Sequence, residues 1–401
     1  MLPDIRRDPC LGRNAVTPIQ PLFRRAAWAV VGLAAFGVAF ELTARLDDLI
    51  RYGMPLASPY RSEVDLVTRD SLGTHGRPGA QYLKWSLNSL GTRGPEVSPL
   101  PGPGVLRVVA TGASETFGQS EGPGREYPRQ LEDSLRASLT GRTSSPYRSV
   151  EVLNAAFFGM SLPTATQDIR LRVSGFGPAI VVLYPASVQY LSDGLPKAET
   201  PPLAAAPALG LGAVLSPRAL ARLREELKRV APRAWREWLW QSQVRRQLAG
   251  HEPGWRYTDV PLDRLAAYEA DLRAFIGTVR SVGAEPVLAT HANRFVGAAD
   301  ADSSLLSAWQ RFYPRPEGQV ILAFDSAGAE VTMRVAADSN VALADVRMAL
   351  TNCPACFADY AHFTDEGAAR VAGTVAGAVE RIVARFPARA VSAVHIPGGS
   401  H

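Results

Sequence analysis

Two short segments near opposite ends of the 401-residue chain contain the residue types of a serine nucleophile and its base. The first is Thr111-Gly-Ala-Ser-Glu-Thr-Phe-Gly118, in which Ser114 lies among small residues directly after an apolar run. The second is Asp359-Tyr-Ala-His362. A carboxylate three residues before an imidazole can orient one ring nitrogen while the other nitrogen faces a nucleophile. Together the two segments predict a triad of Ser114, His362 and Asp359.

The chain around and between these segments alternates short apolar runs with helical patterns. This alternation predicts an α/β fold with a parallel sheet and helices on both faces. In such a sheet the residues just after the strands' carboxyl ends line the ligand crevice, so Ser114 is expected there. The expected strands are 105–110, 149–154, 179–184, 285–290 and 341–346, and the expected helices are 127–139, 164–173, 266–282 and 365–386.

In order and spacing, the segments resemble the sequence blocks of the SGNH/GDSL hydrolase family. Gly112–Gly118 is similar to the first block, Gly-Asp-Ser-x-Thr-x-Gly, with Ala113 in place of the Asp. Asn154–Ser161 is similar to the second block, and the Asp-x-x-His segment with the following Phe-Thr-Asp-Glu-Gly matches the last. Asn88–Glu96 resembles a segment upstream of the first block in membrane-anchored bacterial members. The resemblance covers roughly residues 80–386.

The resemblance implies a three-layer, flavodoxin-like SGNH fold and a serine esterase that needs no cofactor and no metal. Ser114 would be the nucleophile, and His362 would be the general base and then the acid that protonates the leaving alcohol. Asp359 would hold the imidazole tautomer. The N–H groups of Ser114 and Gly159 would stabilise the oxyanion, and such donors are worth roughly 3–4 kcal/mol each.

The chain departs from the family at the third block, Gly-x-Asn-Asp, whose asparagine completes the oxyanion hole. After the third expected strand it reads Tyr184-Pro-Ala-Ser-Val-Gln-Tyr190, where Ser187 or Gln189 would have to substitute. Loss of one donor lowers a rate by about 10²–10³. Three functions therefore stay open: a serine esterase, an O-acyltransferase of cell-surface polysaccharide on the same fold, and a non-catalytic module that binds a glycan or a partner.

Three further residues are candidates for substrate contact. His291 follows the fourth expected strand and would face the same crevice, with a structural histidine as the alternative. Ser187 lies in the departing third block, and Arg93 lies in the upstream segment.

A pair of cysteines, Cys353-Pro-Ala-Cys356, immediately precedes the Asp–His segment. In an exported domain this pair is expected to form a local disulfide that stiffens the loop. The alternative is a zinc site formed by both cysteines with Asp359 and His362. The chain contains no phosphate-binding motif, so no nucleotide cofactor is predicted.

The amino terminus predicts a membrane anchor. Residues 1–25 contain five arginines and two aspartates, a net charge of +3, and residues 26–40 contain no charge. A helix over 26–44 would be roughly 28 Å long, enough to cross a hydrocarbon core. The preceding arginines predict a cytoplasmic amino terminus and a periplasmic remainder of a single-pass bacterial inner-membrane protein. A cleaved signal peptide is the alternative, although no A-x-A-like site follows the apolar run.

These segments predict the organisation of the whole chain. Residues 1–25 form a cytoplasmic tail, 26–44 a transmembrane signal anchor, and 45–104 an irregular lead-in and linker. Residues 105–387 form the catalytic domain, which carries a basic helical insertion at 197–260. Residues 388–401 lack periodicity and are expected to form a disordered tail.

The insertion also explains the net charge of +5. Residues 216–250 contain nine basic and three acidic residues, a net of +6. With the +3 of the amino terminus, this leaves a net charge of −4 on the rest of the chain, and no nucleic-acid-binding motif is present. The basic helix, with Trp235, Trp238 and Trp240, would lie on an anionic membrane surface or act as a lid. The alternative is a solvated insertion whose tryptophans pack on the domain.

Overall fold

The computed structural model describes residues 20–140, 147–202, 217–297 and 303–385. The chain divides into two compact units, one of residues 1–56 with 217–225 and the other of residues 57–216 with 226–401. The tail expected at 388–401 and residues 1–19 of the expected cytoplasmic tail lie outside the described residues.

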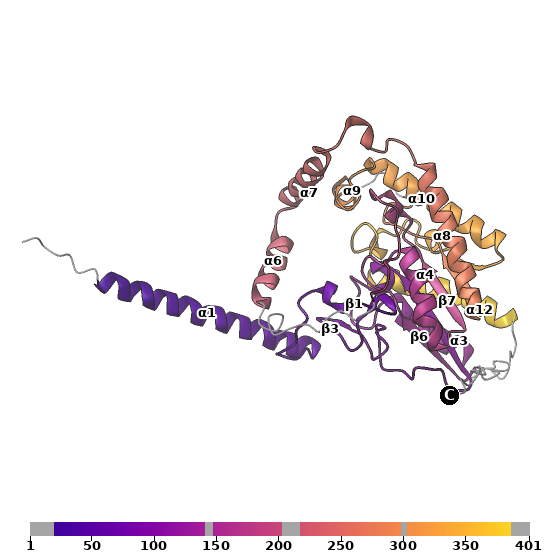
Figure 1. Cartoon of the computed structure of the whole chain (residues 1–401), viewed down its shortest axis with the longest axis horizontal. Coiled ribbons are helices and arrows are strands. Elements are labelled where there is room, and N and C mark those ends of the chain that lie inside the picture. Colours follow the sequence, from indigo (N-terminus) through magenta and orange to yellow (C-terminus); the bar gives the residue numbers. More distant parts are fainter. Residues whose placement is uncertain (1–19, 141–146, 203–216, 298–302, 386–401) are drawn as a thin grey trace, which may run out of the picture. The chain divides into compact units, whose positions relative to one another are not determined.

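The larger unit contains a five-stranded parallel sheet in the order β6-β5-β7-β8-β9. Every expected strand is present, and only the last is clearly shorter than expected. This confirms the predicted α/β class with a central parallel sheet, and Figure 1 shows helices beside its strands. The strands are β5 (Val105–Gly112), β6 (Ser149–Asn154), β7 (Ile180–Tyr184), β8 (Glu285–Ala289) and β9 (Ala342–Ala344).

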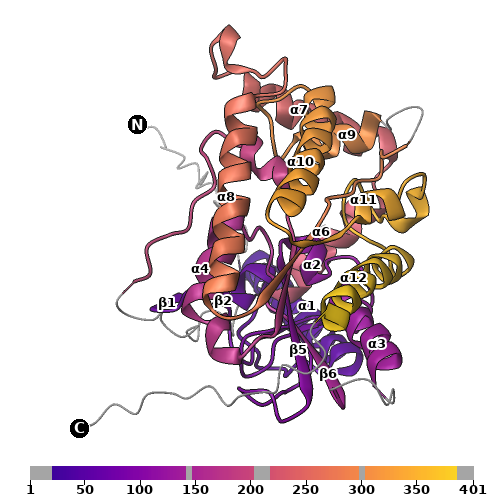
Figure 2. The ribbon, with the colours of Figure 1, turned by 90° about the vertical axis from the view of Figure 1, so that its right-hand side faces the viewer.

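Helices cover both faces of this sheet, which gives the three expected layers. Along β5, Val108 packs with the helices of one face and Val109 with those of the other. Burial on both faces explains why the strands read as continuous apolar runs. Figure 2 shows α3 and α12 together, apart from α4 and α8. One face carries α3 (Tyr127–Leu139) and α12 (Asp365–Arg385), and the other α4 (Leu162–Leu171), α8 (Leu262–Ser281) and α10 (Gly318–Asp338).

Shorter helices connect and flank these elements. They include two basic helices in the predicted insertion, where Trp235 and Trp238 are about half exposed, 52% and 56%. The shorter helices are α2 (Ser114–Phe117), α6 (Arg218–Val230), α7 (Arg233–Leu248), α9 (Ser303–Gln310), α11 (Val346–Ala349), η1 (Glu63–Leu66), η2 (Val173–Phe176), η3 (Ser187–Leu191), η4 (Pro253–Trp255) and η5 (Pro354–Cys356).

The lead-in is more ordered than the sequence predicts. It contains two antiparallel hairpins whose strands are only two to four residues long, too short for an alternating pattern to show. The backbones at Gly76 and Gly91 pack so closely that neither leaves room for a side chain. A Cβ atom on Gly76 would lie 2.2 Å from the carbonyl oxygen of Gly91. The expectation of an irregular segment is therefore corrected. The strands are β1 (Val67–Asp70), β2 (Gly73–Gly76), β3 (Gln81–Tyr82) and β4 (Trp85–Ser86).

The smaller unit consists of the long helix α1 (Gln20–Tyr52) and the first part of α6 (Figure 1). The stretch from Phe23 to Tyr52 is long and apolar enough to cross a membrane. The helix continues eight residues beyond the expected end of the span at residue 44.

Acidic residues near the end of α1 bind the beginning of α6. Glu41 Oε2 accepts hydrogen bonds from the backbone N–H groups of Arg218 and Ala219 at 2.8 and 2.9 Å. The buried Asp48 carboxylate pairs with Arg218 and Arg222. A carboxylate at a helix amino terminus satisfies N–H groups that have no partner within the helix. The polar side chains of this part of α1 therefore have partners within the same unit.

Candidate functional site

The turn after β5 presents Ser114 at the carboxyl edge of the sheet. The turn requires glycine at position 112, where φ is +155°. A Cβ atom there would lie 2.4 Å from Thr116 Oγ1 and 2.6 Å from the Tyr184 carbonyl oxygen. The chain then enters α2, which begins at Ser114. The strand therefore leads without a loop into the helix whose first residue carries the hydroxyl.

Ser114, His362 and Asp359 form one hydrogen-bonded chain. Ser114 Oγ lies 2.8 Å from His362 Nε2, and His362 Nδ1 lies 2.7 Å from Asp359 Oδ2. The other carboxylate oxygen, Asp359 Oδ1, accepts hydrogen bonds from the backbone N–H groups of Ala361 and His362, both at 2.9 Å. The structure thus brings the three residues predicted as a triad into direct contact.

The charged forms of the imidazole and the carboxylate stabilise each other. Burial alone would raise the pKa of Asp359, but the hydrogen bond and charge of His362 hold that pKa below its ordinary value. Burial alone would lower the pKa of His362, but the hydrogen bond and charge of Asp359, with a further contribution from Glu115, raise it. The arrangement therefore favours an imidazolium, the form that a general base acquires when it takes a proton.

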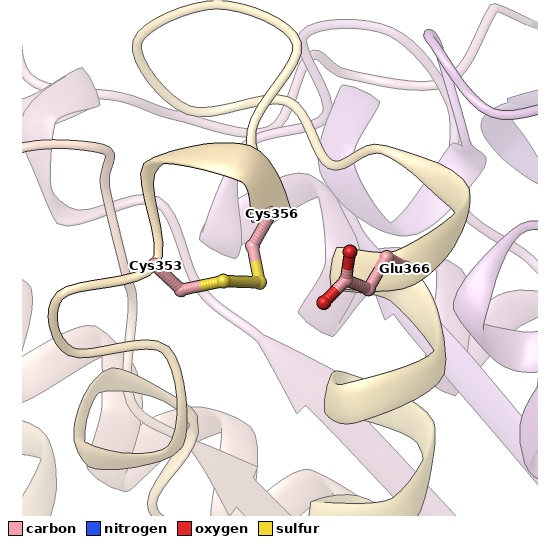
Figure 3. A group of neighbouring side chains, drawn as sticks. All are labelled: Cys353, Cys356 and Glu366. Atoms are coloured by element: carbon pink, nitrogen blue, oxygen red, sulfur yellow. A yellow bond between two sulfur atoms is a disulfide. The ribbon is translucent and has the colours of Figure 1, made fainter.

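A compact loop holds the His362 end of this chain. Ala358 N–H donates to the His362 carbonyl oxygen at 2.8 Å, and Thr364 N–H donates to the Cys356 carbonyl oxygen at 2.9 Å. The loop begins with a disulfide between Cys353 and Cys356, as Figure 3 shows.

The disulfide argues against the alternative of a zinc site at these two cysteines. Its sulfur atoms lie near Glu366 at the start of α12 (Figure 3). Zinc is bound by thiolates, and two sulfurs joined in a disulfide are not thiolates. Asp359 and His362, the other residues of that alternative, are bonded to each other. These residues as placed do not fit a zinc site.

A second group of charged residues lies behind Ser114. Glu115 Oε2 is 3.3 Å from Ser114 Oγ, and Glu115 Oε1 is 3.8 Å from His291 Nε2. His291 Nδ1 is 2.6 Å from Asp325 Oδ1. All three charged side chains are buried. Burial disfavours the charged forms, but the hydrogen bonds and opposite charges of the neighbouring side chains favour them more strongly. The pKa of Glu115 is therefore lowered to about 2 and the pKa of His291 is raised to about 10.

Sequence reasoning missed Glu115 and Asp325. Glu115 directly follows the predicted nucleophile, and Asp325 interrupts the apolar run Val320-Ile-Leu-Ala-Phe324 of α10. A lone carboxylate in a buried helix face needs a partner, so this position offered a signal.

Ser187 and His291 do not lie where a substrate would contact them. Ser187 is fully buried, and its hydroxyl donates to Asp325 Oδ1 at 3.3 Å. His291 is 1% exposed and lies between two carboxylates, as expected for the structural alternative. The expectation of substrate contact is corrected for both, because burial in this charged group removes them from the surface.

Gln189, the other residue considered for the missing asparagine, donates from Nε2 to the Met160 carbonyl oxygen at 3.1 Å. It thereby ties the third block to the turn of the second. Gly159, the expected oxyanion donor, is exposed in this turn and has φ +72°. Ala113, Met160 and Ala186 line one small pocket, so the three blocks converge at Ala113, the residue before Ser114.

Arg93 binds the backbone of the nucleophile turn instead of reaching a substrate. Its side chain is buried, and Nη1 donates to the carbonyl oxygens of Phe117 and Gly118. Its Nη2 is 3.0 Å from the Glu126 carboxylate. The upstream segment therefore holds the Ser114 turn in place, which corrects the expectation of substrate contact for Arg93.

We expect Glu121→Gln to stabilise the protein at pH 8. Burial raises the pKa of Glu121 from 4.5 to about 7, because solvent is excluded from its carboxylate. The native state therefore holds this proton more tightly than the unfolded state, and stability falls as pH rises from 4.5 through 7. The neutral amide avoids that loss, worth on the order of 3 kcal/mol.

Thermal unfolding of the full chain at pH 8 and pH 4.5 would measure the effect of Glu121→Gln. The gain in Tm should appear at pH 8 and fade at pH 4.5. Glu366→Gln, at an exposed ion pair with Arg370, is the control and should leave Tm nearly unchanged. A variant less stable than the wild type at pH 8 would contradict the assignment.

Comparison with known proteins gives similarity at the level of structure only. No family model matches the chain, and no curated protein matches it. Similar solved structures include the lipase/acylhydrolase from Enterococcus faecalis, 15% identical, which covers 71% of this chain and 99% of its own with a TM-score of 0.40. An alpha/beta hydrolase from the metagenome of Lake Arreo, Spain, is 16% identical, with coverages of 68% and 94% and a TM-score of 0.39. An acetyl xylan esterase is 15% identical, with coverages of 68% and 99% and a TM-score of 0.37.

Proposed function

We propose that this protein is an SGNH-type serine esterase with Ser114, His362 and Asp359 as its triad. One observation carries the proposal: the serine hydroxyl, the imidazole and the carboxylate are linked at 2.8 and 2.7 Å, although the serine and the histidine are 248 residues apart in sequence. That arrangement is the one that nucleophilic acyl transfer requires.

The reaction would proceed through an acyl-enzyme. Ser114 Oγ attacks the ester carbonyl as its proton passes to His362 Nε2, and Asp359 stabilises the imidazolium. The N–H groups of Ser114 and Gly159 would bind the oxyanion. Collapse of the intermediate releases the alcohol, which takes the proton from His362. Water then attacks the acyl group with His362 again as the base, which frees the acid and restores the hydroxyl of Ser114.

The proposed substrate is an acyl ester of a cell-surface glycan or lipid, and the proposed location is the periplasmic face of the bacterial inner membrane. The apolar helix α1 and the arginines before it support a single span with a cytoplasmic amino terminus. The disulfide at Cys353 supports an oxidising compartment. The half-exposed Trp235 and Trp238 on a basic helix support contact with the membrane surface. Residues 105–387 would then be the catalytic domain.

A second candidate is a non-catalytic binding module of the same fold. It rests on the missing third-block asparagine, since Ser187 and Gln189 are both bonded elsewhere. An oxyanion hole without this donor would be weaker.

Assays on the full-length protein in detergent would separate these functions. We expect hydrolysis of p-nitrophenyl acetate and covalent labelling by a fluorophosphonate. Product analysis with a sugar acceptor distinguishes an esterase, which releases the free acid, from an acyltransferase, which forms a sugar ester. A folded protein that shows neither hydrolysis nor labelling would reject the enzyme in favour of the binding module.

The anchor is tested separately by amino-terminal sequencing of protein extracted from membranes. An uncleaved anchor leaves residues 1–25 in place, because the span must remain attached. A mature start after residue 40 would show that the segment is a cleaved signal peptide.

A further inference from the structure

The charged group behind the nucleophile consists of side chains from four elements. Glu115 belongs to α2, His291 follows β8, Asp325 belongs to α10 and Arg347 belongs to α11. Asp325 Oδ2 lies 2.6 Å from Asn293 Nδ2 and 3.4 Å from Arg347 Nη1. Charges of alternating sign therefore run from the nucleophile to the partly exposed Arg347.

Burial of these charges is costly unless each one has a partner. Glu115 is 7% exposed, and Asp325 is fully buried. A purely structural role could be met by apolar residues of similar volume, which are often as stable. A role in the chemistry explains why these buried positions are charged. Glu115 Oε2 lies 3.3 Å from Ser114 Oγ, the oxygen that would attack the substrate.

We propose that Glu115 is a second catalytic carboxylate, which stabilises the imidazolium that His362 forms when it takes the Ser114 proton, and that His291 and Asp325 are positioning residues that keep it ionised. This inference rests on the proposed serine esterase and adds to its triad. Asp359 bonds His362 through Nδ1, whereas Glu115 lies 3.3 Å from Ser114 Oγ, the atom that His362 Nε2 contacts.

Asp359 supplies the first negative charge beside His362 and Glu115 the second, whereas Glu121 is only partly ionised near pH 7. His362 interacts with Asp359, Glu115 and Glu121, and burial raises the pKa of Glu121 to about 7. The remaining neighbours of Glu115 are His291 and four tyrosines whose pKa values rise, so they stay neutral near pH 7. These tyrosines are Tyr127, Tyr184, Tyr313 and Tyr360.

The direction of the effect follows from charge. An anion near His362 favours its protonated form, so Glu115→Gln should lower the pKa of His362 by about one unit. The base must be neutral to accept a proton, so the acid limb of kcat/KM should move to lower pH by the same amount. The kcat/KM value on the pH-independent plateau should fall up to about tenfold, because the imidazolium of the transition state loses the same stabilisation.

The pH profile of full-length Glu115→Gln on p-nitrophenyl acetate is the first test. Glu132→Gln is the matched control, since Glu132 is also buried but accepts its hydrogen bonds from the Val152 N–H group, Arg129 and Arg136. We expect this control to change Tm and to leave the acid limb in place. The proposal would be overturned if Glu115→Gln left the acid limb of kcat/KM at the wild-type pH and kept the plateau within twofold of the wild type.

The positioning residues are tested by a double-mutant cycle. His291→Gln leaves two buried carboxylates without the cation between them, so it should lower Tm strongly. Adding Glu115→Gln removes one of those carboxylates and should recover part of the Tm while the plateau stays low. Additive losses of Tm would show that the two side chains are not coupled, against the proposal.

An NMR titration of His362 in a Ser114→Ala background separates this inference from the esterase itself. Adding Glu115→Gln to that background should lower the pKa of His362, whether or not the protein hydrolyses esters. Equal values with and without the second substitution would overturn the inference even in an active enzyme. A wild type that neither hydrolyses nor labels would reject the proposed function, and the titration would still decide the role of Glu115.

Discussion

Ser114→Ala is expected to lower hydrolysis of p-nitrophenyl acetate by at least about 10⁴-fold and to abolish fluorophosphonate labelling. The methyl side chain cannot form the acyl-enzyme, and His362 Nε2 loses the hydroxyl that it now contacts at 2.8 Å. The fold should persist, because the change removes one oxygen from a partly exposed side chain.

Ser134→Ala is the matched control for Ser114→Ala. Ser134 lies on α3, and its hydroxyl donates to the Gln130 carbonyl oxygen within the same helix. This variant should keep wild-type activity and labelling. Equal labelling of Ser114→Ala and the wild type would remove Ser114 as the nucleophile.

Asp359→Asn is expected to lower kcat/KM by about 10⁴-fold without unfolding the loop. The amide oxygen can still accept the N–H groups of Ala361 and His362, which now bind Asp359 Oδ1. The amide nitrogen would instead face His362 Nδ1 and act as a donor. The imidazole would then carry its proton on Nε2, where it cannot accept one from Ser114.

Activity and Tm should be measured together for this variant. Asp338→Asn is the control, because Asp338 is an exposed partner of Arg273 at 2.9 Å and lies away from the triad. It should leave both quantities near the wild type. A loss of less than tenfold in Asp359→Asn would show that Asp359 does not set the imidazole tautomer.

The expected strands and the candidate triad were readable from sequence because their signals are local. Strands buried on both faces, such as Ile180–Tyr184, need an apolar side chain at every position. Asp359 binds backbone N–H groups only two and three residues further on, so the spacing of the segment already contains its geometry.

The roles of Arg93 and the short lead-in hairpins were not readable from sequence. Arg93 binds backbone carbonyl oxygens of Phe117 and Gly118, and a carbonyl oxygen is present at every residue. The hairpin at Gly76 depends on contact with the backbone at Gly91. Such contacts leave little trace in residue type, so the sequence predicted a substrate contact for Arg93 and an irregular segment for the hairpins.

The sequence by itself determined which residues have the chemistry of a nucleophile, a base and an orienting acid, and that they follow or precede elements of one parallel sheet. Only the tertiary structure decided that Ser114 and His362 meet at 2.8 Å and that His291 lies between Glu115 and Asp325. The physical reason is that strand order and helix packing set distances between elements far apart in the chain. A residue's own neighbours in sequence fix its chemistry and its local turn, but not its partner across the sheet.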